Sequence, residues 1–150
     1  MPIIYVDADA CPGEVRDLLI KTAYRLKITT IFISNKPLGL QLSELIQHQL
    51  VAQGADVADG VIAELAVKGD LVVTQDIPLA HILVNKKVVT LSPYGHVFDD
   101  RNIGERLSMR NALADFREVG AITGGPKPFD AVTKRNFANA LDRELHRLLK

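Results

Sequence analysis

The chain has 150 residues, and its 18 lysines and arginines balance 18 aspartates and glutamates, so the formal net charge is zero. This length suits one domain spanning residues 1–150, and a composition of 47% hydrophobic and 24% charged residues excludes a disordered chain. Its apolar stretches are too short to span a bilayer and no signal-peptide pattern is visible, so we expect no membrane partner. The single cysteine, Cys11, cannot form an internal disulfide, which favours the cytoplasm.

Two asymmetries underlie the zero net charge. Aspartate outnumbers glutamate by twelve to six, although aspartate is a poor helix former and is better suited to caps, turns and metal sites. Acidic residues are in excess in the first half of the chain, and basic residues are in excess in the second half. A balanced total therefore does not exclude a nucleic-acid partner.

Short apolar runs alternate with helical patterns along the first two thirds of the chain. The β-branched run before Asp7 predicts a strand, and Pro12 opens a helical pattern of apolar residues. The predicted strands are 3–6, 29–33, 49–52, 71–74 and 88–91. The predicted helices are 12–26, a helical turn at 40–46, 59–67, 78–85, 103–116 and 129–149, with a Gly- and Pro-rich loop at 120–128.

This order of elements predicts the fold class. Strands that alternate with helices indicate parallel βαβ units, because a parallel strand pair needs a long crossover between its members. We therefore predict an α/β protein: a three-layer α/β/α sandwich with a mainly parallel five-stranded sheet, followed by C-terminal helices. In such sheets ligands bind at the edge formed by the carboxyl ends of the strands.

Aspartates stand at several of these strand and helix ends. Asp7 and Asp9 follow the first strand, Asp76 follows the fourth strand, and Asp59 stands at the start of the helix that leads into the fourth strand. If the first and fourth strands are neighbours, these four side chains converge on one edge. The alternative interpretation is that they only cap helices, which aspartate does well.

Four converging carboxylates predict a cation site. Like charges held close together are unfavourable, and a hard divalent cation such as Mg²⁺ or Mn²⁺ offsets their repulsion with oxygen ligands. Such a cation polarises a phosphoryl oxygen and lowers the pKa of a bound water. Asp7, Asp9, Asp59 and Asp76 are therefore the candidate metal ligands and catalytic residues of a hydrolase that acts on phosphodiesters.

Five short runs carry a resemblance to a known family. They are residues 5–12 (YVDADACP), 56–59 (DVAD), 69–80 (GDLVVTQDIPLA), 102–103 (NI) and 124–126 (GGP). With these runs, nearly the whole chain resembles the bacterial YaiI/YqxD family, which is assigned to the PIN-like nucleases. The resemblance implies the PIN-like α/β/α fold with strand order 3-2-1-4-5, a nuclease-type acidic site that matches Asp7, Asp59 and Asp76, and a homodimer.

Two other functions remain open at this point. The Asp7-x-Asp9 pair also resembles the first motif of haloacid-dehalogenase-like phosphatases, with Asp99 and Asp100 as the late acidic pair and Lys86 or Lys87 as their lysine. Against this, Cys11 stands where those enzymes have threonine or valine. The third interpretation is a non-catalytic module that binds nucleic acid or protein and keeps a vestigial acidic site. Cys11 itself is expected to be a small packing residue.

Basic residues in the second half predict how a substrate is held. Arginine suits bidentate contacts with phosphate, and several arginines follow the fifth predicted strand at roughly helical spacing. The candidate substrate-binding residues are Thr74, Arg101, Arg106, Arg110 and Lys127. The alternative interpretation is that these arginines lie on a solvent-exposed helix face and form local ion pairs. The predicted function is a Mg²⁺- or Mn²⁺-dependent nuclease whose expected partner is RNA.

Overall fold

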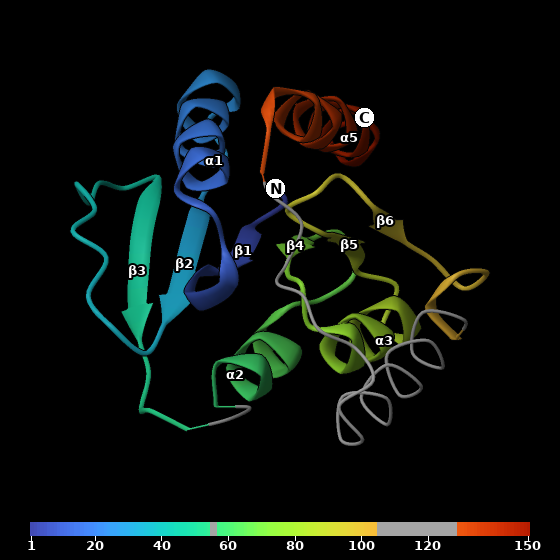
Figure 1. Ribbon diagram of the computed structural model, residues 1–150, viewed down its shortest axis with the longest axis horizontal. Coiled ribbons are helices and arrows are strands. Elements are labelled where there is room, and N and C mark those ends of the chain that lie inside the picture. Colours follow the sequence, from blue (N-terminus) through green and yellow to red (C-terminus); the bar gives the residue numbers. More distant parts are fainter. Residues whose placement is uncertain (55–56, 105–128) are drawn as a thin grey trace.

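The computed structural model describes residues 1–54, 57–104 and 129–150. Its strands are β1 (Ile4–Asp7), β2 (Thr30–Ser34), β3 (Ile46–Leu50), β4 (Leu71–Val73), β5 (Val89–Leu91) and β6 (Val97–Phe98). Its helices are a short 3-10 helix, η1 (Ala8–Ala10), and the α-helices α1 (Gly13–Leu26), α2 (Val57–Leu65), α3 (Ile77–Asn85) and α5 (Ala131–Leu148). The alternation of strands and helices confirms the α/β class (Figure 1).

The six strands form one sheet in the order β3-β2-β1-β4-β5-β6. The first five strands run parallel, and β1 lies between β2 and β4. The first and fourth strands are therefore neighbours, as the placement of the aspartates requires. The prediction of five strands is wrong, because β6 pairs antiparallel with the end of β5.

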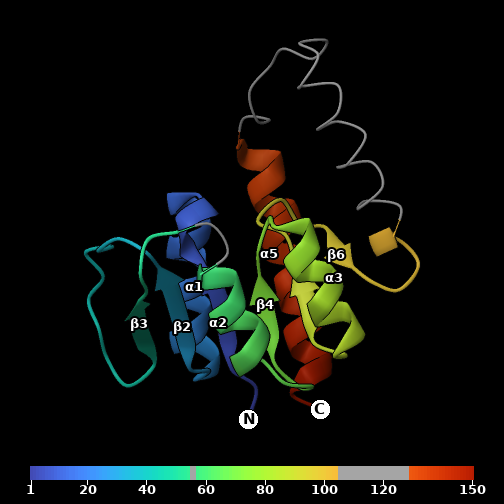
Figure 2. The same ribbon diagram turned by 90° about the horizontal axis from the view of Figure 1, so that it is seen from below.

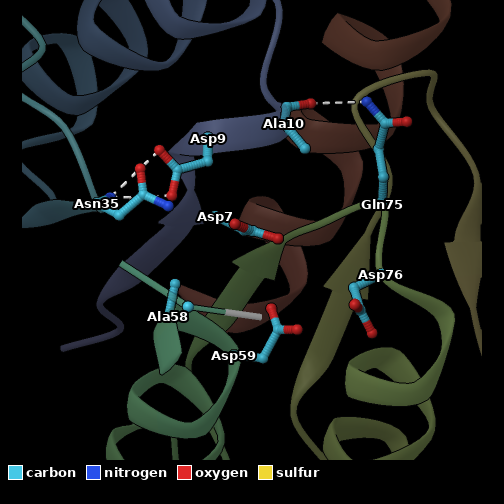
Figure 3. A pocket seen from close by; sticks show the side chains of 9 residues that line it. Asp7, Asp9, Ala10, Asn35, Ala58, Asp59, Gln75 and Asp76 are labelled. Carbon is cyan, nitrogen blue, oxygen red and sulfur yellow. Dashed lines mark hydrogen bonds between the residues drawn. The ribbon is translucent and has the colours of Figure 1, made fainter. Parts of the chain in front are cut away.

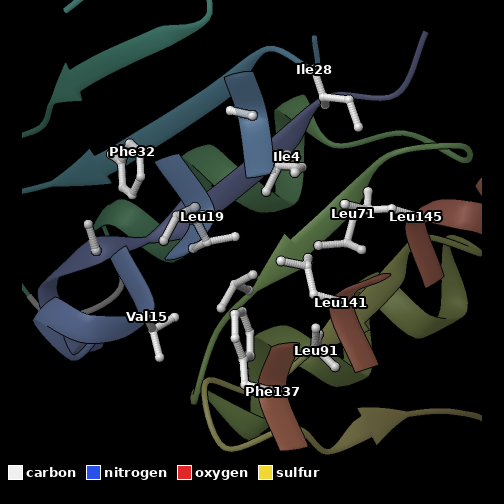
Figure 4. Packing of buried hydrophobic residues seen from close by; sticks show 14 of the residues in the cluster. Ile4, Val15, Leu19, Ile28, Phe32, Leu71, Leu91, Phe137, Leu141 and Leu145 are labelled. Atoms are coloured by element: carbon white, nitrogen blue, oxygen red, sulfur yellow. The ribbon is translucent and has the colours of Figure 1, made fainter. Parts of the chain in front are cut away.

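Helices cover both faces of the sheet (Figures 1 and 2). Successive side chains of a strand point to opposite faces, so Ile4 and Val6 join one cluster while Tyr5 joins the other. The first cluster packs the sheet against α1 and α5, and Figure 4 shows Phe137, Leu141 and Leu145 of α5 within it. The second cluster packs the sheet against α2 and α3. Because both faces are buried there, the central strands β1 and β4 are almost continuously apolar.

Two predictions between β2 and β3 are wrong. No helical turn forms at 40–46, because Ser43 Oγ accepts the backbone N–H groups of Leu45 and Ile46 and so competes with helical bonding. The third strand begins at Ile46 and ends at Leu50, earlier than the predicted 49–52. Ile46 is fully buried, whereas the polar residues that follow it lie on the exposed edge of the sheet.

The helix ends differ from the predictions by small amounts. Residue Asp59 lies in the first turn of α2, which begins at Val57, so it is not the residue before the helix. The last helix begins after Asp130, whose carboxylate accepts the Thr133 N–H at 2.8 Å. Most of the predicted helix 103–116 and the whole loop 120–128 lie outside the described residues. No helix in the described part of the chain is long and apolar enough to cross a membrane.

Candidate functional site

A pocket of about 340 Å³ lies at the carboxyl ends of β1 and β4 (Figure 3). All four candidate aspartates line it, although they come from different elements. Together with them the described lining residues are Ala10, Asn35, Gly54, Ala58 and Gln75. Because β1 and β4 are parallel neighbours, the segments that follow these two strands both begin at this edge. The structure therefore assembles Asp7, Asp9, Asp59 and Asp76 around one hollow.

Asp7 is the last residue of β1, and its side chain lies at the floor of the pocket with 8% of the residue exposed. Its Oδ2 accepts a hydrogen bond from Thr74 Oγ1 at 2.9 Å. Burial raises the pKa of the Asp7 carboxyl, and the negative charges of Asp76 and Asp9 raise it further, while the Thr74 hydrogen bond opposes this shift. Asp7 is thus a buried carboxyl group whose charge the neighbouring carboxylates disfavour.

Thr74 follows β4 and connects two of the aspartates. Its Oγ1 donates to Asp7 and accepts the backbone N–H of Asp76 at 3.0 Å. The residue is only 1% exposed, which leaves almost no surface for a substrate to touch. The structure therefore makes Thr74 a positioning residue for the carboxylates.

The remaining aspartates each have a local structural contact. Asp9 lies in η1, and its two oxygens accept the Asn35 N–H at 3.2 and 2.9 Å, which ties η1 to the end of β2. Asp76 caps α3, because its Oδ1 accepts the Leu79 N–H at 2.8 Å. Asp59 projects from the first turn of α2 (Figure 3). The capping interpretation is therefore correct for one oxygen of Asp76, while the pocket is lined by all four carboxylates.

The donor set suits a hard cation in its chemistry, because it consists of carboxylate and amide oxygens. Among the described residues, however, no three histidine, cysteine, aspartate or glutamate side chains are grouped closely enough to hold one metal ion. Figure 3 shows the reason for Asp9, whose carboxylate is turned toward Asn35. The side chains must therefore rearrange before three of them can share an ion.

Two amide residues in the pocket were missed at the level of sequence. Asn35 directly follows β2, and Gln75 follows β4 between Thr74 and Asp76. The Gln75 side chain donates to the Ala10 carbonyl oxygen at 2.7 Å and so spans the gap between β4 and η1. Both lie within two residues of a strand end, so a search of the strand ends that included neutral polar residues would have found them.

The predicted basic residues are not assembled at this pocket in the described structure. Arg101 is exposed in the turn after β6, where its backbone N–H donates to Asp99 Oδ1 at 2.9 Å, and it does not line the pocket. The other three, Arg106, Arg110 and Lys127, lie outside the described residues. The described part of the site is consequently acidic.

The residues that a haloacid-dehalogenase-like phosphatase would need lie elsewhere. Because β6 runs antiparallel to β5, Asp99 and Asp100 follow it at the amino end of β5, opposite to the edge that holds Asp7. There Lys87 Nζ lies 3.6 Å from Asp100 Oδ2. Lys86 donates instead to the Ala63 carbonyl oxygen at 2.6 Å. Neither lysine lines the aspartate pocket.

Cys11 stands beside the pocket and packs against the core cluster under α1. Burial raises the pKa of its thiol to about 12, the charge of Asp7 raises it as well, and the Arg16 guanidinium opposes the shift. A thiol with this pKa stays protonated at neutral pH and is a poor nucleophile. As the sequence predicts, Cys11 is a packing residue.

Comparison with known proteins agrees with this arrangement of motifs. Residues 5–147 match the model of the family described as "Uncharacterized BCR, YaiI/YqxD family". The chain belongs to the YaiI/YqxD family. It is similar to a "UPF0178 protein" of Myxococcus xanthus, with 51% identity over 98% of this chain and 96% of that protein. It is also similar to "UPF0178 protein DP1304" of Desulfotalea psychrophila, with 49% identity over 97% and 98%.

A third relative of this YaiI/YqxD protein is "UPF0178 protein Pfl01_5469" of Pseudomonas fluorescens, with 43% identity over 98% of this chain and 97% of that protein. The three relatives named here are bacterial, and each alignment covers almost the full length of both chains. No solved structure matches the chain. The family is therefore established by sequence, while the names of these relatives state no activity.

Proposed function

We propose that this YaiI/YqxD protein has a PIN-like three-layer fold and is a nuclease that uses Mg²⁺ or Mn²⁺ to hydrolyse RNA. The observation that carries the proposal is the shared pocket of Asp7, Asp9, Asp59 and Asp76 at the carboxyl edge of β1 and β4. The buried Asp7 adds to it, because burial raises the pKa of its carboxyl and the charges of Asp76 and Asp9 raise it further. Once the side chains rearrange to share an ion, a divalent cation would offset the repulsion among these carboxylates.

Each residue has a distinct part in the proposed site. Asp7, Asp59 and Asp76 would hold the cation, and Thr74 orients Asp7 through its hydroxyl group. Asp9 is already engaged with Asn35 and holds the end of β2 beside the pocket. A cation bound here supplies polarisation of a phosphoryl oxygen and activation of a water. The phosphatase alternative receives less support, since Lys87 and the Asp99–Asp100 pair lie at the opposite edge of the sheet.

The first test measures cation binding by thermal denaturation. A ligand that binds only the native state raises the melting temperature as its concentration passes Kd. We expect millimolar Mn²⁺ to raise the melting temperature of the wild type and to have a much smaller effect on Asp76→Asn. Asparagine is also a good helix cap, so this variant keeps the start of α3 intact. A wild type that does not respond to Mn²⁺ would contradict the metal site.

The second test measures the reaction. With Mn²⁺ present, the wild type should cut labelled RNA, and Asp7→Asn should cut it at least about 100-fold more slowly, in line with loss of a group that acts in the transition state. Asp17→Asn is the matched control, because Asp17 is an exposed residue of α1 outside the pocket. Equal cutting by the wild type and Asp7→Asn would mean a contaminating nuclease, and no cutting by the wild type would favour the non-catalytic alternative.

A further inference from the structure

A second hollow adjoins the aspartate pocket and is lined by residues at the start of α3 and along α2 and α3. Its volume is about 300 Å³, and Asp59 and Asp76 line both hollows. Beyond these two carboxylates the wall is formed by small or aliphatic residues of the two helices. They are Gly60, Ala63, Pro78, Leu79 and Ile82. We call this hollow the α2–α3 groove.

Two features show that the α2–α3 groove has room for a ligand. A Cβ added at Gly60 would meet nothing within 4 Å, so the space over this turn of α2 is open. On the opposite wall Ile82 is 48% exposed, which leaves a large aliphatic surface in contact with water. Removing such a surface from water is favourable for any flat apolar group that fits the groove.

We infer that the α2–α3 groove binds the base of a ribonucleotide whose phosphate lies at the aspartate pocket. This inference rests on the proposed function, which sets a phosphodiester beside the carboxylates. A nucleotide carries a flat aromatic ring with apolar faces one sugar away from its phosphate. The two adjoining hollows offer an aliphatic wall next to an acidic pocket. The groove volume of about 300 Å³ suits a single ring system.

The boundary between the hollows fits a ribose. Asp59 and Asp76 stand there, and carboxylates only accept hydrogen bonds when ionised. The hydroxyl groups of ribose are donors that such an acceptor recognises, and the 2′-hydroxyl is the group that distinguishes RNA from DNA. Asp76 uses Oδ1 for the Leu79 N–H, and a carboxylate has several further acceptor positions. The groove therefore favours a ribonucleotide over a deoxyribonucleotide.

The test compares two ligands by calorimetry in the presence of Mg²⁺. Adenosine 5′-monophosphate has a base, and ribose 5-phosphate presents the same sugar and phosphate without one. We expect the wild type to bind adenosine 5′-monophosphate about tenfold more tightly, which corresponds to partial burial of one base. Equal affinities, or no binding of adenosine 5′-monophosphate, would overturn the inference. The 2′-deoxy nucleotide should bind more weakly than the ribonucleotide, and equal binding would overturn the assignment of the ribose.

Substitutions at Gly60 fill the groove to different extents. Gly60→Leu should reduce the affinity for adenosine 5′-monophosphate to that for ribose 5-phosphate, without changing the latter. Gly60→Ala is the matched control, since both variants gain helix propensity but alanine leaves most of the space open. If Gly60→Leu does not fold, Ile82→Ser removes the aliphatic wall at a half-exposed position and should have the same effect. Unchanged nucleotide affinity in the folded variant would overturn the inference.

Failure of the groove and failure of the proposed function give different results. If RNA is cut in an Asp7-dependent manner but the base does not contribute to affinity, only the groove inference is wrong. If the base contributes to affinity but RNA is not cut, the proposed reaction is wrong and the groove remains a nucleotide site. The binding measurement therefore stands apart from the activity assay.

Discussion

Because the Asp7 carboxyl is buried, its protonation affects the free energy of unfolding. Its folded-state pKa is raised above the usual value of 3.8, first by burial and then by the charges of Asp76 and Asp9. A raised pKa means that folding favours the protonated form, so the stability contributed by Asp7 is fully present below pH 3.8 and is lost as the pH rises through the raised pKa. The ionised carboxylate is thus unfavourable for folding at neutral pH.

Asp7→Asn should therefore be more stable than the wild type at neutral pH without divalent cations. Asparagine keeps an oxygen that accepts the Thr74 hydroxyl, so the variant removes charge rather than the hydrogen bond. The difference in the free energy of unfolding should shrink as the pH falls through the raised pKa and should be gone below pH 3.8, as urea denaturation at several pH values will measure. A constant difference across pH would contradict the raised pKa.

Asp130 provides a control of opposite sign for this experiment. The Thr133 backbone and side-chain hydrogen bonds lower the pKa of the Asp130 carboxyl at the start of α5. Its contribution to stability is present above pH 3.8 and is lost as the pH falls through the lowered pKa. Asp130→Asn should therefore be less stable than the wild type at neutral pH, with a difference that vanishes in acid.

Residues at strand ends differ in how far the sequence reveals them. Asp7 and Asp76 could be predicted as site residues, because each is a charged residue near the end of an apolar run that predicts a strand. The Thr74–Asp7 hydrogen bond could not, since it depends on the register that sets Val6 beside Val73. Asn35 and Gln75 carry no charge, and their role in the pocket emerges only when three strand ends are seen together.

At the scale of elements, long periodic patterns were predicted well and short ones were not. The apolar spacing of α1 and α5 is repeated over many residues, so both helices were found with small errors at their ends. Strand β6 has only two residues, too few to show a hydrophobic pattern. It forms because the chain reverses after β5 and pairs with Thr90 and Leu91. The polar edge strand β3 was misplaced because its burial is confined mainly to Ile46.

The turn between β5 and β6 gives a prediction at this scale. Gly95 has φ of +91°, and a Cβ there would lie 2.8 Å from the Asn136 carbonyl carbon in α5. Gly69 has φ of +104°, but a Cβ there would meet nothing within 4 Å. Gly69→Ala should cost only the backbone strain, about 1–2 kcal/mol. Gly95→Ala should cost about 2–5 kcal/mol in total, because the contact with α5 adds overpacking.

Urea denaturation of the two alanine variants measures these costs. The comparison is matched, because both glycines have positive φ and differ in their surroundings. Equal costs for the two variants would show that α5 does not press against this turn. A larger cost for Gly95→Ala would establish that the turn and α5 form one packed unit with the end of the sheet.

For the whole molecule, the strand order explains why the site lies where it does. The chain crosses from β3 back to β4 beside β1, so the sheet centre is the point where acidic segments from both sides meet. The meeting of the aspartates could be predicted from the sequence, because the carboxyl ends of parallel strands lie at one edge of the sheet. It did not reveal the α2–α3 groove, which arises from the packing of two helices that the sequence treats separately. The excess of aspartate thus indicates which edge of the sheet holds the site, while the packing of α2 against α3 determines the shape of the groove beside it.

An acidic edge of this kind should make the stability of the molecule sensitive to salt. Between about 0.01 M and about 1 M KCl the Debye length falls from about 30 Å to about 3 Å. Repulsion between the buried Asp7 and the half-buried Asp76 is therefore weakened, although less than between fully exposed charges. We expect the wild type to gain about 1 kcal/mol more than the Asp7→Asn/Asp76→Asn variant over this range. The matched control is Asp17→Asn/Glu64→Gln, which removes the same charge at exposed positions of α1 and α2.

The free energy of unfolding in urea, measured for all three proteins at each salt concentration, decides between two origins of the effect. If repulsion is concentrated at the pocket, the control keeps the salt response of the wild type, and only the pocket variant loses it. If the response falls equally in both variants, it reflects total charge rather than the grouping of Asp7 with Asp76. That outcome would remove the electrostatic reason for a cation at this edge, because carboxylates that do not repel one another need no cation between them.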